Sequence, residues 1–367
     1  MRKLFFLACF LTATIYFGQN KENTISKPNK EYAKDSPEWV FIKAQNCFVH
    51  GDIDSLVTFL HPIQLEYFKN AMLASLSDSI NAKQLKSIYS DYKNLNEIKY
   101  IPADRFMSMF FKYLFNKMPL IKKVNAATRF KIVGHINSDS AAVYIIYKVI
   151  QQYLTLKDST VLFGLCKKYN NIWKASLPAS LNNAFLSFIK NSDHNSGLET
   201  PLTEQDIIAS GSFPKGSPGW VGNEGLKYTK ASDYDNFTLL MHPTAIKKQA
   251  AYLKKLLNEE VFDEEIAPNN SEYKSYNEFI NLSDMKLFSF FFKYSPFKID
   301  VLTNALKNSK FAILGYIIEN DTTAYAITKI HAYVNGAQYI MTDLIKFLKY
   351  NGDWKMLLRK EPETEFN

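Results

Sequence analysis

The sequence predicts an α+β protein: two tandem copies of an N-terminal helical part packed on a curved four-stranded antiparallel meander sheet. Three observations predict it. Residue types recur at a constant spacing of 181 positions, apolar residues follow helical spacing early in each copy, and apolar and polar residues alternate late in each copy.

The repeat is clearest between residues 130–173 and 311–354. A gap-free overlay of residues 36–177 on 217–358 gives 33 identities in 142 positions, whereas unrelated chains of ordinary composition match at about one position in 15. The excess predicts an internal duplication. The residues that carry it most clearly, each matched 181 positions later, are Phe130, Ile132, Gly134, Ile136, Tyr144, Ile146, Lys148, Tyr169, Trp173 and Lys174.

The first part of each copy is predicted to be helical. Ser36 and Ser217 each precede a proline, which is typical of a helix start with a hydroxyl cap. His61 and His242 also precede prolines, and the residue before proline is displaced from helical geometry, so a helix ends there. Residues 106–114 carry apolar side chains on one helical face. We expect the sheet to wrap around this last helix.

The last part of each copy is predicted to be a meander of four strands. In the first copy residues 130–136 alternate between apolar and polar, and three more apolar segments follow at 142–150, 161–169 and 172–177. Gly134 and its counterpart Gly315 fall within a strand, where a bend or bulge is the usual reason for glycine.

The chain begins as secreted proteins do. Arg2 and Lys3 precede an apolar run at 4–17 that is short for a membrane span, and a polar stretch follows Gly18. Cys9 leaves a lipoprotein anchor as the alternative. The predicted organisation is a signal peptide at 1–19, a disordered tether at 20–35, copy 1 at 36–177, a linker at 178–216, copy 2 at 217–360 and a tail at 361–367. We expect the protein to be exported, either periplasmic or extracellular, with no later transmembrane segment.

Composition and charge exclude several classes of protein. With 47% hydrophobic and 22% charged residues the chain is core-forming rather than disordered. Its net charge of +8 comes from scattered lysine pairs with acids between them, so we expect no nucleic-acid partner. Neither a metal-ligand spacing nor a phosphate loop nor a nucleophile elbow occurs, so the sequence predicts no cofactor and no metal.

Two cysteines follow the predicted signal, Cys47 and Cys166, and both belong to copy 1. Two interpretations stay open: two small buried apolar side chains, or one disulfide in an oxidising compartment.

His61 and His242 are candidate ligand-binding residues, because a histidine at the end of an element can act as a general base. The alternative is that each imidazole satisfies backbone carbonyls left where proline stops the helix. Asp54 and Asp235 lie seven residues earlier, about 10 Å along a helix axis, which is too far for a direct relay.

Two further sets of candidates repeat between the copies. The run Phe-Phe-Lys-Tyr at 110–113 recurs at 291–294, so Tyr113 and Tyr294 are candidates, with core packing as the alternative. Alternation places one tyrosine and one lysine on the same strand face in each copy: Tyr144 with Lys148, and Tyr325 with Lys329. A concave face would seat an anionic or aromatic ligand there, whereas an outer face would leave them as solvent-side residues.

Helices followed by a curved meander, whose last strand carries Trp-Lys behind Tyr-Asn, resemble the nuclear transport factor two-like group of the cystatin-like fold. The resemblance covers both copies through this general pattern. It implies α+β cone domains that often pair through their sheets, so we expect the copies to form an intrachain pseudo-dimer. Members of the group include isomerases, dehydratases and protein-binding modules, and the pocket carboxylates or Asp/His pairs of its enzymes have no matching positions here.

The function expected from these observations is that of a non-enzymatic tandem binding module. Its partner would be a small apolar or amphipathic ligand, or an envelope protein. The alternatives are a hydrolase or isomerase that uses a pocket histidine or tyrosine (His61, Tyr113 or Tyr144), and a structural spacer without a pocket.

Overall fold

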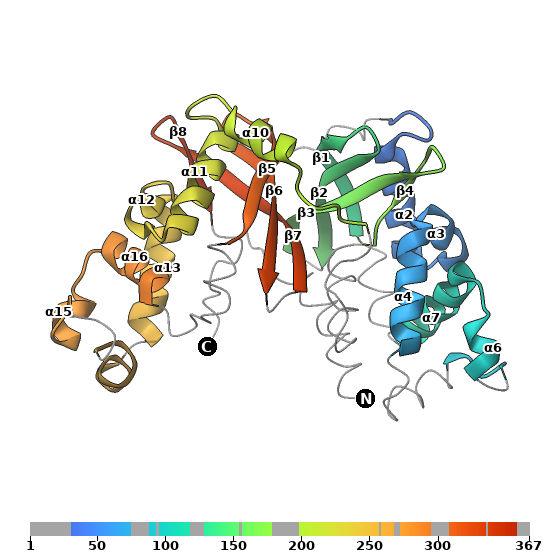
Figure 1. Ribbon diagram of the computed structural model, residues 1–367, viewed down its shortest axis with the longest axis horizontal. Coiled ribbons are helices and arrows are strands. Elements are labelled where there is room, and N and C mark those ends of the chain that lie inside the picture. Colours follow the sequence, from blue (N-terminus) through green and yellow to red (C-terminus); the bar gives the residue numbers. More distant parts are fainter. Residues whose placement is uncertain are drawn as a thin grey trace. The chain divides into compact units, whose positions relative to one another are not determined.

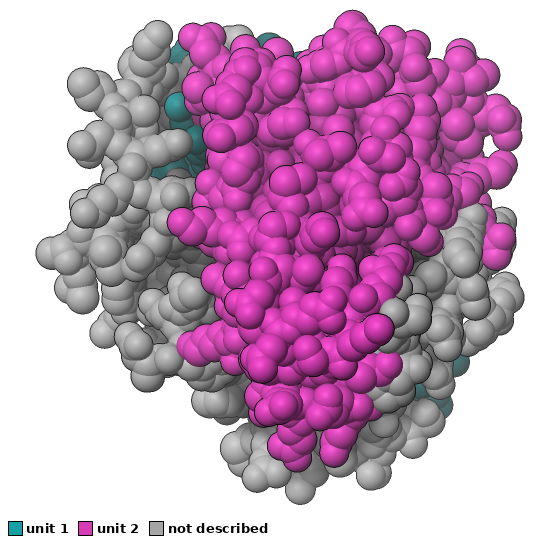
Figure 2. All heavy atoms as spheres, turned by 90° about the vertical axis from the view of Figure 1, so that its left-hand side faces the viewer, with its two compact units in different colours: residues 1–199 teal, residues 200–367 magenta. Residues whose placement is uncertain are grey.

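The computed structural model describes residues 31–74, 88–92, 95–117, 128–153, 156–177, 198–256, 258–267, 272–294, 308–334 and 337–357 (Figure 1). The chain divides into two compact units, residues 1–199 and 200–367, which are coloured separately in Figure 2. The division falls within the predicted linker. The predicted signal peptide and the predicted tail lie outside the described residues.

Unit 1 is α+β, with its helices first and its sheet last. The helices are α2 (Pro37–His50), α3 (Ile53–Phe59), α4 (Pro62–Ala74), α6 (Leu95–Lys99) and α7 (Ala103–Lys117). The strands are β1 (Thr128–Asp139), β2 (Ala142–Tyr153), β3 (Leu156–Tyr169) and β4 (Ile172–Ala175). They form an antiparallel sheet in the order β1-β2-β3-β4, so the predicted meander is confirmed.

Unit 2 has the same order of helices and sheet. Its helices are α10 (Glu204–Gly211), α11 (Pro218–Ala231), α12 (Tyr234–Leu239), α13 (Pro243–Leu256), α14 (Glu259–Val261), a π-helical turn at Phe262–Ile266, α15 (Tyr276–Ile280) and α16 (Asp284–Tyr294). A second antiparallel sheet contains β5 (Lys310–Asn320), β6 (Thr323–Val334), β7 (Ala337–Tyr350) and β8 (Asp353–Leu357) in chain order. The α+β class and the two separate four-stranded sheets are therefore as predicted.

The predicted helix starts are confirmed by their caps. The Ser36 hydroxyl accepts a hydrogen bond from the Trp39 amide at 3.2 Å, and the Ser217 hydroxyl accepts one from the Trp220 amide at the same distance. Each serine is followed by proline at the first helical position, where the missing N–H costs no hydrogen bond.

The predicted irregularity at the strand glycines is confirmed as well. The register of β1 against β2 shifts between Ile132 and Gly134, and that of β5 against β6 shifts between Ile313 and Gly315. Such a shift inserts one extra residue and bends the strand.

The expectation that the sheet wraps around the helix at 106–115 was wrong in its choice of helix. In unit 1 the helix that contacts all four strands is α2, while α7 packs on α3 and α4 (Figure 1). Phe41 of α2 is fully buried and lies over Gly164 of β3, where the absence of a side chain lets the ring approach the strand. This close approach lets α2 pack directly on the sheet.

In unit 2 the helix on the sheet is α11, which contacts β5, β6 and β8. Gly222 of α11 provides the close approach, since a Cβ atom there would lie 3.1 Å from Ile313 and 3.3 Å from Phe347. A second aromatic core gathers around α15, with Phe262, Phe279 and Phe290 buried.

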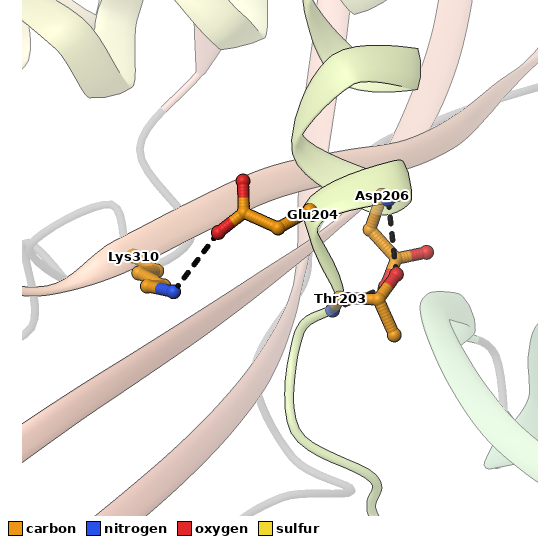
Figure 3. Close-up of polar contacts among 4 residues, drawn as sticks. All are labelled: Thr203, Glu204, Asp206 and Lys310. Atoms are coloured by element: carbon orange, nitrogen blue, oxygen red, sulfur yellow. Dashed lines mark hydrogen bonds and ion pairs between the residues drawn. The ribbon is translucent and has the colours of Figure 1, made fainter.

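Helix α10 covers the β5 edge of unit 2. The Thr203 hydroxyl accepts from the Asp206 amide and the Asp206 carboxylate accepts from the Thr203 amide, a capping box, while Glu204 pairs with Lys310 of β5 at 3.3 Å (Figure 3). The buried Ser210 hydroxyl accepts from the Ile313 amide at 2.8 Å. An otherwise open strand edge therefore finds a hydrogen-bond partner in this helix.

Several contacts occur in both units at positions 181 apart. The backbone N–H of each histidine before proline donates to the last strand, His61 to Ala175 O at 2.9 Å and His242 to Met356 O at 2.8 Å. Other matched contacts are Lys174 to Thr58 O and Lys355 to Leu239 O, Lys168 over the Trp173 ring and Lys349 over the Trp354 ring, and Ser108 to Asp54 and Ser289 to Asp235. The last strand of each unit is thus tied to the same helix end.

None of the helices in the described part of the chain combines the length and the apolar character that crossing a bilayer requires.

Candidate ligand-binding site

A hollow of about 550 Å³ opens in unit 1 where α2, α3 and α7 meet. We call it the α2–α7 hollow. It is lined by Val49, His50, Gly51, Ile53, Lys112, Phe115 and Asn116. Its volume lies within the range of small-molecule sites, roughly 300–1,000 Å³.

A sharp corner between α2 and α3 forms one side of the hollow. Gly51 adopts φ +72°, a left-handed conformation that ends α2, and its N–H donates to the carbonyls of the last helical turn. The Asp52 carboxylate then accepts from the Ser55 amide at 3.2 Å and starts α3. A Cβ atom at position 51 would lie 3.7 Å from the Phe115 ring, so the corner faces α7.

The apolar lining is aliphatic and aromatic. Ile53 is 2% exposed and Phe115 is 7% exposed, and Phe48 packs edge-on against Phe115 with ring centroids 5.3 Å apart. Val49 is also buried. These three lining side chains belong to three different helices, so the apolar wall is a tertiary feature.

One charged group stands at the hollow, Lys112 of α7. Its ammonium lies 2.6 Å from Asp54 Oδ1 and 2.7 Å from Oδ2, and the Ser108 hydroxyl donates to Oδ1 at 2.7 Å. The hydrogen bond from Lys112, and after it that from Ser108, lowers the pKa of the Asp54 carboxyl below its ordinary value. The lysine side chain is 48% exposed, so it is accessible from solvent.

The equivalent positions of unit 2 have different side chains. Tyr234 stands at the position of Ile53, and its ring stacks on Phe292 with centroids 6.1 Å apart. Lys230 replaces Val49 and donates to Ser309 O at 2.8 Å. The lining is therefore apolar in unit 1 and carries a large ring and a lysine in unit 2.

The structure places His61 away from the hollow. The residue is 2% exposed, and its ring lies edge-on to Tyr169 with centroids 5.6 Å apart. Burial, followed by the nearby Lys167, lowers the pKa of His61, while a hydrogen bond with the Lys168 backbone opposes this. Within the described residues its Nδ1 atom is buried without a hydrogen-bond partner.

His242 occupies the matching place in unit 2, edge-on to Tyr350 with centroids 5.6 Å apart. Its Nδ1 atom accepts from the Thr244 amide at 3.2 Å, and burial lowers its pKa. For His242 the expected alternative, in which the imidazole donates to carbonyls at the end of the preceding helix, is therefore wrong. The ring caps the start of the following helix, because an N–H is the group left over at that end.

The tyrosine and lysine candidates on the strands do not face the helices. In unit 1 the residues that pack beneath α2 are Val143, Ile145 and Tyr147, so Tyr144 points to the opposite face, yet it is 1% exposed. Its hydroxyl donates to Glu199 Oε2 at 2.7 Å. Lys148 is half-buried. The solvent-side alternative is therefore wrong for Tyr144.

The strand candidates of unit 2 behave similarly. Tyr325 is 1% exposed and donates to Glu319 Oε2 at 3.1 Å, and Lys329 is 3% exposed and donates to Thr200 O at 3.3 Å. Tyr113 is half-buried against the unit 1 core. Tyr294 is the last residue of α16, and its side chain lies outside the described part.

None of the eight predicted candidates lines the α2–α7 hollow. Sequence reasoning missed its residues because they are not repeated 181 positions later, apart from Lys112. That lysine lies within the repeated run at 110–113, and the same helical spacing that puts its neighbours in the core puts Lys112 on the open side. A lysine inside an aromatic run is thus the feature of the sequence that could have indicated this site.

Cys47 and Cys166 are both unbonded, so the interpretation as a disulfide is corrected. Cys166 is fully buried, and its thiol donates to Pro37 O at 3.4 Å. No group of three His, Cys, Asp or Glu side chains able to hold a metal ion occurs among the described residues.

Comparison of the chain with protein-family models, curated proteins and solved structures finds no match. Fold and site together define an α+β protein of two units, with a partly apolar hollow in the first.

Proposed function

We propose that the protein is an exported, non-enzymatic binding module, and that unit 1 holds a small amphipathic ligand in the α2–α7 hollow. One observation carries the proposal: three apolar side chains, Val49, Ile53 and Phe115, share a hollow of about 550 Å³ with the exposed ammonium of Lys112. An apolar wall with few polar groups is the usual composition of a small-ligand site.

Binding is favoured over catalysis because the three side chains expected to act in acid–base chemistry lie elsewhere, and the histidine that does line the hollow, His50, is exposed at its rim. His61 packs against Tyr169, the Tyr144 hydroxyl is held by Glu199, and Tyr113 packs at the core. A general base needs to reach the substrate within hydrogen-bond distance, and none of these three side chains belongs to the lining of the hollow.

We also propose that the two units arose by tandem duplication of an ancestral domain of the nuclear transport factor two-like type. Support comes from the identities at a spacing of 181 residues and from contacts matched at that spacing, such as the two histidine–tyrosine ring pairs. The unlike residues at the hollow fit a division of labour, in which only the first copy kept or acquired the ligand site.

Export is part of the proposal and rests on the first 19 residues. Their order, two basic residues, an apolar run and a polar stretch, is that of a signal peptide.

The binding proposal is tested with N-phenyl-1-naphthylamine, an uncharged fluorophore that brightens in apolar surroundings. The wild-type mature chain is expected to bind it saturably. Ile53→Tyr places in unit 1 the ring that unit 2 carries as Tyr234, and it is expected to abolish binding by filling the hollow. Ile53→Leu conserves volume and serves as the control that retains binding. Wild-type protein that does not bind the probe, or binding that survives Ile53→Tyr, would contradict the proposal.

A further inference from the structure

We infer that the ligand of the α2–α7 hollow is a carboxylate-headed amphiphile, whose head group binds Lys112 and whose apolar tail lies along Val49, Ile53 and Phe115. This inference rests on the proposed function and specifies the chemistry of its ligand.

The charge at the hollow selects the sign of the head group. Lys112 is the charged member of a lining that otherwise consists of apolar side chains, a glycine, an amide and the exposed imidazole of His50. An ammonium has three donors and no acceptor. A head group that accepts hydrogen bonds and carries negative charge therefore gains most from the lysine, whereas a cationic head group gains nothing from it.

The group that Lys112 already holds is itself a carboxylate. Both oxygens of Asp54 lie within 2.7 Å of the ammonium, and the Ser108 hydroxyl holds one of them as well. The lysine is 48% exposed and the aspartate 71% exposed. Ion pairs between exposed groups contribute little to stability, because water screens them. A ligand carboxylate can therefore replace Asp54 as the partner of Lys112 with little loss of folding free energy.

In unit 2 the lysine at the matching helix position pairs with a different carboxylate. Lys293, the counterpart of Lys112, pairs with Glu272, which lies outside the α12–α16 contact. The Ser289 hydroxyl meanwhile donates to Asp235 at 2.6 Å, as Ser108 does to Asp54. The serine–aspartate contact therefore ties the two helices together in both units, whereas the carboxylate that pairs with the lysine differs between them.

The apolar lining residues determine which kind of ligand tail fits the hollow. Val49, Ile53 and Phe115 line the hollow, and an apolar ligand surface placed against them is removed from water. An alkyl chain fits this wall better than a sugar or a nucleotide, whose polar groups would find few partners among the lining residues.

The experiment measures displacement of N-phenyl-1-naphthylamine by dodecanoate, dodecanol and dodecyltrimethylammonium, each below its critical micelle concentration. For wild type we expect dodecanoate to compete about threefold better than dodecanol, which corresponds to one exposed ion pair, and the ammonium compound to compete worst. Lys112→Met is expected to remove the advantage of dodecanoate and to leave dodecanol unchanged.

Lys293→Met is the matched control, because it removes the equivalent lysine of unit 2, and it is expected to leave all three competitors unaffected. If dodecanoate and dodecanol compete equally while Ile53→Tyr still abolishes probe binding, the carboxylate inference is wrong and the proposed function stands. If the probe does not bind wild type, or binds Ile53→Tyr equally well, the proposed function itself fails. A loss of carboxylate preference in Lys293→Met would place the site in unit 2 and overturn the inference.

Discussion

Phe41 and Gly164 are in such close contact that a Cβ atom at position 164 would lie 2.4 Å from Cε2 of the phenylalanine. The contact fixes α2 on the unit 1 sheet. In unit 2 the glycine is on the helix and the large side chain is on the strand. Gly222 stands at the position of Phe41, and Phe347 stands at the position of Cys166. Each unit therefore places one glycine where this helix packs on the sheet, on the strand in unit 1 and on the helix in unit 2, where Ile345 stands at the position of Gly164.

Gly164→Ala is expected to destabilise unit 1 by about 1–3 kcal/mol, because the added methyl group overlaps a fully buried ring. Thermal and urea unfolding followed by circular dichroism measure the effect. Gly211→Ala is the control, since nothing lies within 4 Å of a Cβ atom there. Equal stability of the two variants would show that Phe41 does not need the space above β3.

Acid is expected to destabilise the protein through His61. Burial lowers its folded-state pKa below the ordinary value of 6.5, with the ammoniums of Lys167 and Lys174 acting in the same direction. The unfolded state therefore binds the proton first, and stability falls as the pH drops through 6.5 toward the lowered folded-state pKa.

Urea midpoints of wild type and His61→Gln between pH 8 and pH 5 check this pH dependence. His242, whose pKa burial also lowers, keeps part of the dependence in the variant. The expected result is a shallower loss of stability in His61→Gln than in wild type. An unchanged slope would show that His61 is not protonated on unfolding in this range.

How much of this structure the sequence predicts depends on the range of the interactions involved. Ser36, Ser217 and Gly134 act within a few residues of themselves, and the caps and the bulge they predict are present. The choice of α2 as the helix on the sheet depends on Phe41 meeting Gly164, 123 positions later. No local pattern indicates that contact, and amphipathic spacing alone favoured the helix at 106–115.

The candidate site could not be predicted from local sequence patterns for the same reason. The hollow exists because the corner at Gly51 faces Phe115, and the partner of Lys112 comes from a different helix. The repeat directed attention to residues shared by the two units, such as His61 and His242, which perform matched structural roles. The hollow is lined mostly by residues that differ between the two units, such as Ile53, whose matching residue is Tyr234.

Cys47 and Cys166 are both expected to be free thiols in a chain expressed from residue 20, which lacks Cys9. Burial raises the pKa of Cys47 and of Cys166, so both are protonated and slow to react in the folded protein. Titration with Ellman's reagent in guanidinium chloride, without reductant, should give two thiols per chain, and one each in Cys47→Ser and Cys166→Ser. Zero thiols in the wild type would establish a disulfide and contradict the structure.

Pairing of the two units within one chain stays a prediction from the sequence. Limited proteolysis within residues 191–216, followed by size-exclusion chromatography, tests it. Co-elution of the two fragments is the expected result, and elution as separate species would rule out a stable pseudo-dimer.

The most direct test of the central claim, that unit 1 binds an amphipathic ligand between α2, α3 and α7, is photolabelling with a dodecanoate that carries a diazirine near the end of its chain. Peptide mass spectrometry then locates the label. We predict attachment within residues 49–53 or at Phe115, with competition by unlabelled dodecanoate and loss in Ile53→Tyr. Labelling confined to unit 2, or labelling that excess dodecanoate does not reduce, would contradict the account.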